Sequence, residues 1–222
     1  MALSFENIVV ILIIISFFMT FVAFFMIAKR GPTHSEKQLR KLADELGFSL
    51  LGGEPVLPKV RFLRFIKTPL SVVSPDPNNA LKIYHFTRGS GKNSTTYAAI
   101  QFSDLNTKEL KCEIYEQGLL SKIGKTLGMQ DIPVGNANFD ERFIIKSNDQ
   151  NFIRTILLPE IQERILEAWN QQNARGRITL NNNILAYEEI GTIRDDATRE
   201  RFKYMLSVMY LLRDAIDVYI SR

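Results

Sequence analysis

The chain of 222 residues contains one cysteine, Cys112, and only two histidines, His34 and His85. A single cysteine excludes an internal disulfide, which suits a reducing compartment. So few cysteine and histidine ligands also argue against a structural zinc site. The sequence lacks internal repeats, low-complexity tracts and a glycine-rich nucleotide-binding fingerprint. We therefore predict no metal site and no cofactor, and we identify no catalytic residues.

The side chains that could support catalysis have simpler explanations. A dyad of Cys112 and His85 would require their two strands to pair. Neighbouring residues on a strand point to opposite faces, so two of the three carboxylate pairs cannot converge on one substrate. The third pair is explained by helix capping. These pairs are Asp140–Glu141, Glu188–Glu189 and, at the helix start, Asp195–Asp196. Enzymatic activity stays open, and the sequence favours a function without it.

Charged residues are absent from residues 8–28, the longest hydrophobic run in the chain. Its only polar members, Ser16 and Thr20, can hydrogen-bond back into their own helix. A helix of this length spans roughly 30 Å, the thickness of the hydrocarbon core of a bilayer. A cleaved signal peptide is the alternative, but it needs a leading basic region and a shorter apolar core. We predict a transmembrane helix over residues 8–28.

Basic residues are also absent before this run and abundant after it. Such residues close to a transmembrane end stay on the cytoplasmic side, so we expect residues 1–7 outside and the main domain in the cytoplasm. The same residues are predicted to contact anionic lipid headgroups. Nucleic-acid binding is not expected, because no recognisable module interleaves basic and aromatic residues. The predicted membrane-surface residues are Lys29, Arg30, Lys37, Arg40 and Lys41.

The remaining chain predicts an α+β fold with a mainly antiparallel sheet and a long C-terminal helix. Residues 29–58 are expected to form a basic juxtamembrane linker, with a short helix over 35–46 that starts in a capping box of Ser35 and Gln38. Residues 59–222 are expected to form one soluble domain. Its predicted strands are 60–66, 81–87, 95–102, 110–115, 139–146, 176–180 and 184–188, and its helices are 118–128, 150–170 with a break at Pro159, and 197–221.

The tip of the hairpin between 81–87 and 95–102 is a glycine-containing stretch with basic residues at Arg88 and Lys92. It differs from a phosphate-binding loop, because Phe86 and Asn93 replace required residues and a strand follows instead of a helix. Open backbone amides beside basic side chains can still contact a ligand or partner. The candidate contact residues are Arg88, Gly89, Gly91 and Lys92.

Three segments of the sequence resemble an uncharacterised family of bacterial single-pass membrane-anchored proteins with a cytoplasmic α+β domain of unknown function. They are the hairpin tip 89–94, the Phe139-x-x-x-Phe143 segment running into Ser147, and the helix that contains Leu157-Leu158-Pro159-Glu160. The resemblance covers roughly residues 60–190. It implies a bacterial inner-membrane location, and it implies no activity and no site residue.

These observations predict a membrane-tethered binding or scaffolding protein. An anchor confines the domain to two dimensions and raises the effective concentration of a protein partner. The hairpin tip and the exposed flank of the last helix are the expected contact surfaces. Two alternatives stay open: a membrane-bound enzyme acting on a phosphorylated or lipid-like substrate, and a small accessory subunit of a larger membrane complex.

Overall fold

The computed structural model describes residues 12–20, 32–53, 69–76, 80–118 and 130–222. The chain divides into two compact units, Met1–Thr33 and His34–Arg222. In the first unit residues 12–20 are helical, and Thr20 Oγ1 donates to the carbonyl oxygens of Ser16 and Phe17 at 2.9 and 2.8 Å. The rest of the predicted membrane segment lies outside the described residues. Within the described ranges, no helix is both long enough and apolar enough to cross a membrane.

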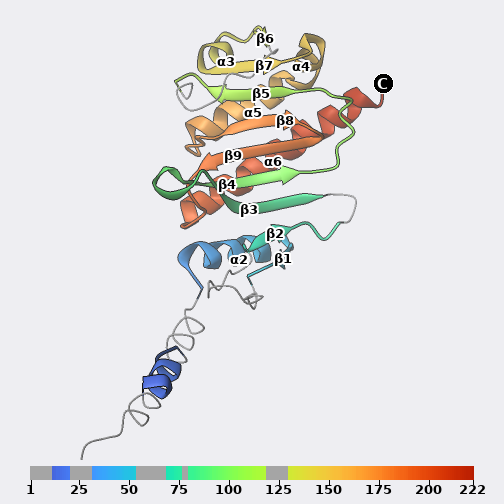
Figure 1. The fold of residues 1–222 in the computed structure, drawn as a ribbon. Coiled ribbons are helices and arrows are strands. Elements are labelled where there is room, and N and C mark those ends of the chain that lie inside the picture. Colours follow the sequence, from blue (N-terminus) through green and yellow to red (C-terminus); the bar gives the residue numbers. More distant parts are fainter. Residues whose placement is uncertain (1–11, 21–31, 54–68, 77–79, 119–129) are drawn as a thin grey trace, which may run out of the picture. The chain divides into compact units, whose positions relative to one another are not determined.

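The second unit is built on one sheet whose neighbouring strands are all antiparallel, which confirms the predicted α+β class (Figure 1). In the described residues it has nine strands in the order β1-β2-β3-β4-β9-β8-β5-β7-β6. The strands are β1 (Ser49–Leu51), β2 (Ser71–Val73), β3 (Leu81–Arg88), β4 (Thr95–Phe102), β5 (Cys112–Glu116), β6 (Gln130–Asp131), β7 (Phe143–Ser147), β8 (Arg177–Asn181) and β9 (Ile184–Ile190).

The long helices lie on one face of this sheet. In Figure 1, α5 and α6 cross behind the strands, and α2 and α4 contact α6. The helices are α2 (His34–Leu46), α3 (Ala137–Arg142), α4 (Gln150–Ile156), α5 (Pro159–Asn170) and α6 (Asp196–Ile220). Among the described residues no helix covers the opposite face, which we call the helix-free face (Figure 1).

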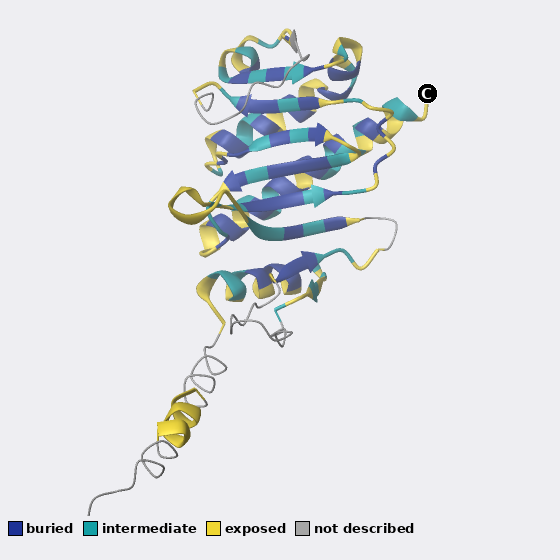
Figure 2. Ribbon diagram, viewed as in Figure 1, coloured by how far each residue is buried: buried dark blue, intermediate teal, exposed yellow. Residues whose placement is uncertain are grey.

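Strand alternation separates the core from the helix-free face. Ile83 on β3 pairs with Ile100 on β4, which pairs with Tyr187 on β9, and all three are fully buried on the helix side. Their strand neighbours point the other way, where Figure 2 shows intermediate exposure between the buried positions of β3. A sheet with one packed face and one more polar face is common for antiparallel strands.

Several predicted elements are confirmed. The hairpin forms as β3 and β4, and β8 and β9 are joined by a tight turn at Asn182 and Asn183, whose φ angles of 50° and 63° suit asparagine. Pro159 divides the predicted long helix, since it is the first residue of α5. The apolar stripe of α6 is core: its buried members include Phe202, Met205, Leu206, Met209, Leu212 and Ile216.

Two local predictions are wrong. Residues 139–142 belong to helix α3 instead of a strand, because the Asn136 side chain caps that helix by accepting from the Phe139 N–H. The capping box at Ser35 is not formed, because Ser35 lies inside α2 and its hydroxyl hydrogen-bonds to His85 Nδ1. The predicted strand 60–66, and residues 119–128 of the predicted helix, lie outside the described residues.

The compact unit starts at His34, inside the segment predicted to be a linker. The reason is the packing of α2, which buries Leu39, Leu42 and Ala43. An ion-pair network joins α2 to α6, in which the Arg199 guanidinium contacts Glu45 at 3.1 Å. Helix α2 is therefore part of the folded domain.

Candidate functional site

Aromatic and arginine side chains gather on the helix-free face where β3, β4, β9 and β8 lie side by side. Register places Phe86 opposite Tyr97 on this face, and their rings stack with centroids 5.3 Å apart. The Arg88 guanidinium carbon lies over both rings, 5.0 Å from the Phe86 centroid and 5.3 Å from the Tyr97 centroid. Stacking on aromatic faces restricts this guanidinium to one orientation.

A carboxylate on β9 joins Arg88 to a second arginine. Arg88 Nη1 and Nη2 donate to the two oxygens of Glu188 at 3.0 and 2.8 Å. Arg177 on β8 donates to Glu188 Oε2 from Nε at 3.2 Å and from Nη2 at 2.9 Å. We call Arg88, Arg177 and Glu188 the arginine pair site. Fork-like contacts of this kind are strong and directional.

A neighbouring tyrosine extends this surface. The Tyr84 hydroxyl donates to Gln101 Oε1 at 2.6 Å, and the Tyr84 ring lies 5.6 Å from that of Phe86. Burial and then the Glu188 charge raise the pKa of Tyr84. The phenol therefore stays protonated and acts as a hydrogen-bond donor at neutral pH.

The predicted contact residues at the hairpin tip lie in different environments. Arg88 extends back over the sheet, whereas Lys92 is exposed in the short turn Gly91–Asn93. Gly89 has a φ of 88°, and a Cβ there would meet the Asn93 carbonyl oxygen at 2.4 Å, so the tight turn requires glycine. Gly91 also has a positive φ, 56°. The two glycines thus shape the turn.

The predicted membrane-surface residues are only partly described. Lys29 and Arg30 lie outside the described residues. Lys37, Arg40 and Lys41 are exposed on α2, on the side away from its buried leucines. Lys41 Nζ lies 3.8 Å from Asp196 Oδ1, and both side chains are mostly exposed, so this ion pair contributes little.

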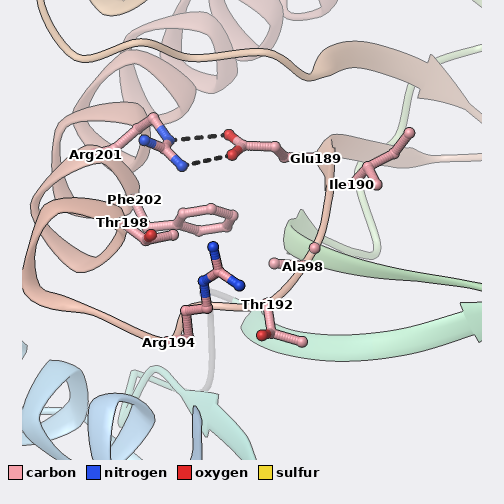
Figure 3. Close-up of a pocket in the computed structure, with 9 residues that line it drawn as sticks. Ala98, Glu189, Ile190, Thr192, Arg194, Thr198, Arg201 and Phe202 are labelled. Carbon is pink, nitrogen blue, oxygen red and sulfur yellow. Dashed lines mark hydrogen bonds and ion pairs between the residues drawn. The ribbon is translucent and has the colours of Figure 1, made fainter. Parts of the chain in front are cut away.

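A cavity of about 250 Å³ lies on the helix side, at the start of α6 (Figure 3). Arg201 donates to both oxygens of Glu189, from Nη2 at 2.7 Å and Nε at 3.1 Å, and the Tyr187 hydroxyl also donates to Glu189 at 2.6 Å. Burial and this carboxylate raise the pKa of Tyr187 well above its ordinary value. The lining residues are Ala98, Glu189, Ile190, Gly191, Thr192, Arg194, Thr198, Arg201 and Phe202.

This cavity is poorly suited to acid–base or nucleophilic catalysis. Both Glu189 oxygens are engaged, and the Arg201–Glu189 pair holds β9 to α6. The nine lining residues include no histidine, cysteine or serine. We assign its charged groups a structural role.

The other hypotheses about reactive residues are resolved by topology. Cys112 is on β5 and His85 on β3, and these strands do not pair, so the dyad does not form. Cys112 is buried, and burial raises the pKa of its thiol to about 12. The described residues contain no cluster of three or more histidine, cysteine or acidic side chains that could hold a metal ion.

Glu188 and Arg177 are not predicted from the sequence as partners of Arg88. Their only sequence signal is alternation along β8 and β9, which places them on one face without showing which strand lies beside which. Comparison with known proteins adds nothing, since no family model, curated protein or solved structure matches the chain.

Proposed function

We propose that this protein is a membrane-tethered binding or scaffolding protein, and that its helix-free face is the binding surface. The observation that carries the proposal is the position of the helices, which in the described residues cover one face of the sheet only (Figure 1). The other face presents stacked aromatic rings and ordered arginines. Aromatic and arginine side chains are enriched at the centres of protein interfaces.

The proposed tether is the hydrophobic segment 8–28. Its length, its lack of charge and the basic residues that follow it favour a single-pass anchor, with the domain on the cytoplasmic side of a bacterial inner membrane. Confinement to the membrane plane would raise the partner's effective concentration.

Cysteine labelling tests the anchor and its orientation. Ser4→Cys and Lys92→Cys place single thiols before the anchor and at the hairpin tip, while Cys112 is buried. We expect a membrane-impermeant maleimide to label position 4 in intact spheroplasts and position 92 only after permeabilisation. Labelling of position 92 in intact spheroplasts contradicts the orientation, and release of the protein by alkaline carbonate contradicts the anchor.

Photo-crosslinking tests the binding surface. A crosslinking amino acid replaces Ile190, which is 51% exposed and lies opposite Tyr97 on the helix-free face, and a matched control replaces Glu163, which is exposed on α5. We expect one discrete adduct from position 190 and none from 163, with the same partner co-purifying with the detergent-solubilised full-length protein. Equal adducts at both positions, or a protein that purifies alone, would contradict the proposal.

A further inference from the structure

Two arginines on the helix-free face share one carboxylate. Arg88 and Arg177 both pair with Glu188, at 2.8 and 2.9 Å. Within the described residues neither arginine pairs with another acidic side chain. The arginine pair site therefore carries two positive charges against one negative charge.

Arg88 and Arg177 also keep N–H donors that no described residue uses. Each guanidinium has five N–H donors. Arg88 Nε and Arg177 Nη1 have no acceptor among the described residues, because the four hydrogen bonds to Glu188 use other nitrogens. The side chains of Arg88 and Arg177 are 48% and 23% exposed, so a ligand can reach them from solvent.

The two guanidinium groups are ordered before any ligand arrives. Arg88 lies over the Phe86 and Tyr97 rings, and Arg177 is held by two hydrogen bonds to Glu188. Donors that are already oriented lose less side-chain entropy when they bind. Guanidinium groups are also weakly hydrated and match the geometry of oxyanions.

We infer that the arginine pair site binds a phosphate group, with Arg88 and Arg177 as its donors. A phosphate monoester has three terminal oxygens, so it can accept from both arginines while Glu188 stays in place, and its negative charge meets the unbalanced positive charge. The phosphate monoester can belong to a soluble phosphorylated molecule or to a lipid headgroup such as that of phosphatidic acid. This inference rests on the proposed function, because it assigns a ligand class to the same face.

Calorimetric titration of the detergent-solubilised full-length protein with inorganic phosphate, at constant ionic strength, tests the inference. We expect saturable binding, and a loss of roughly tenfold or more in affinity for Arg177→Gln, the effect of one charge-assisted hydrogen bond. Arg154→Gln removes an exposed arginine from α4 and serves as the matched control, with no expected change.

Glu188→Gln gives the decisive result, because it removes the competing negative charge and keeps one side-chain oxygen that can accept from the arginines. We expect this variant to bind phosphate more tightly than the wild type, a gain that misfolding cannot produce. Absence of saturable binding in both the wild type and Glu188→Gln overturns the inference. Equal affinity of the wild type, Arg177→Gln and Arg154→Gln also overturns it.

Nanodiscs distinguish the two sources of the phosphate. If a lipid headgroup is the ligand, soluble phosphate binds in phosphatidylcholine nanodiscs and is displaced when phosphatidic acid is included. If the ligand is soluble, both nanodiscs give the same affinity. Phosphate binding without a crosslinked adduct at Ile190 supports this inference and contradicts a protein partner. A crosslinked adduct at Ile190 without phosphate binding contradicts this inference and leaves the proposed function in place.

Discussion

His85 connects two distant parts of the domain and has a defined protonation state. Its Nε2 accepts from the Ile193 N–H at 3.0 Å, and its Nδ1 lies 3.1 Å from Ser35 Oγ. A backbone N–H can only donate, so Nε2 carries no proton and the neutral ring holds its proton on Nδ1. Burial lowers the pKa of His85 from 6.5 to about 4.

This lowered pKa sets the size and sign of a pH effect on stability. In the unfolded chain the imidazole takes up its proton near pH 6.5, whereas in the folded chain it does so near pH 4. The unfolded state therefore binds more protons between these values, and the free energy of unfolding falls as the pH falls. The free energy of unfolding is not reduced by His85 above pH 6.5. It falls by about 3 kcal/mol when the pH is lowered from there to pH 4.

His85→Gln tests this reasoning, since glutamine can accept from Ile193 but does not titrate. Urea denaturation of the full-length protein and the variant at pH 7 and pH 4 compares their free energies of unfolding. We expect the difference between them to move by about 3 kcal/mol in favour of the variant at pH 4. The carboxylates titrate in both proteins and cancel. An NMR titration of His85 measures its pKa, and a pH-independent difference between the two proteins would refute the reasoning.

Three further predictions concern single positions. Lys108 and Glu109 have φ angles of 47° and 65° in a turn that is closed by the hydrogen bond from the Leu110 N–H to the Thr107 carbonyl oxygen. Because a positive φ strains residues other than glycine, Glu109→Gly should raise the free energy of unfolding by about 1 kcal/mol in urea denaturation at pH 7. The Asp195 carboxylate caps α6, and Asp195→Ala should cost about 1 kcal/mol in the same assay. Cys112 is buried with its thiol pKa raised to about 12, so a disulfide reagent at pH 8 should label it only after urea unfolds the protein.

Elements with local causes were predictable. Asp195 accepts from the Thr198 N–H at the start of α6, as its place in the pair Asp195–Asp196 suggested. The failure at residues 139–142 has a local cause too. Phe139 and the apolar run 143–145 that follows predict one strand, but Asn136 caps a helix over residues 137–142 and the Asp140 carboxylate accepts from the Val134 N–H at 2.9 Å. A capping side chain outweighed the apparent strand pattern.

The arginine pair site could be predicted only in part. The sequence indicated that Glu188 and Glu189 point to opposite faces, and the structure confirms this, because Glu188 pairs with Arg88 and Glu189 with Arg201. Arg88 and Glu188 lie 100 positions apart in the chain. They meet because β4 pairs with β9 instead of the next strand, β5, and no local pattern encodes that long-range pairing.

The proposed tether and the arginine pair site together predict how binding should depend on confinement. Two guanidinium groups give a phosphate only a few hydrogen bonds, and association entropy offsets much of their free energy, so the affinity should be low. Residues 34–222 form a compact unit with their own core. Without the anchor, this unit should bind inorganic phosphate with the same affinity as the full chain. It should no longer bind a membrane-bound partner when both proteins are present at native abundance.

An unrelated transmembrane helix fused before His34 should restore occupancy of that partner, measured by crosslinking at Ile190, because confinement alone raises the effective concentration. If the partner supplies the phosphate, the same fusion carrying Arg177→Gln should not restore this occupancy. If the unrelated helix does not restore binding and the native segment 8–28 does, then the segment itself contacts the partner, and a purely tethering role is contradicted.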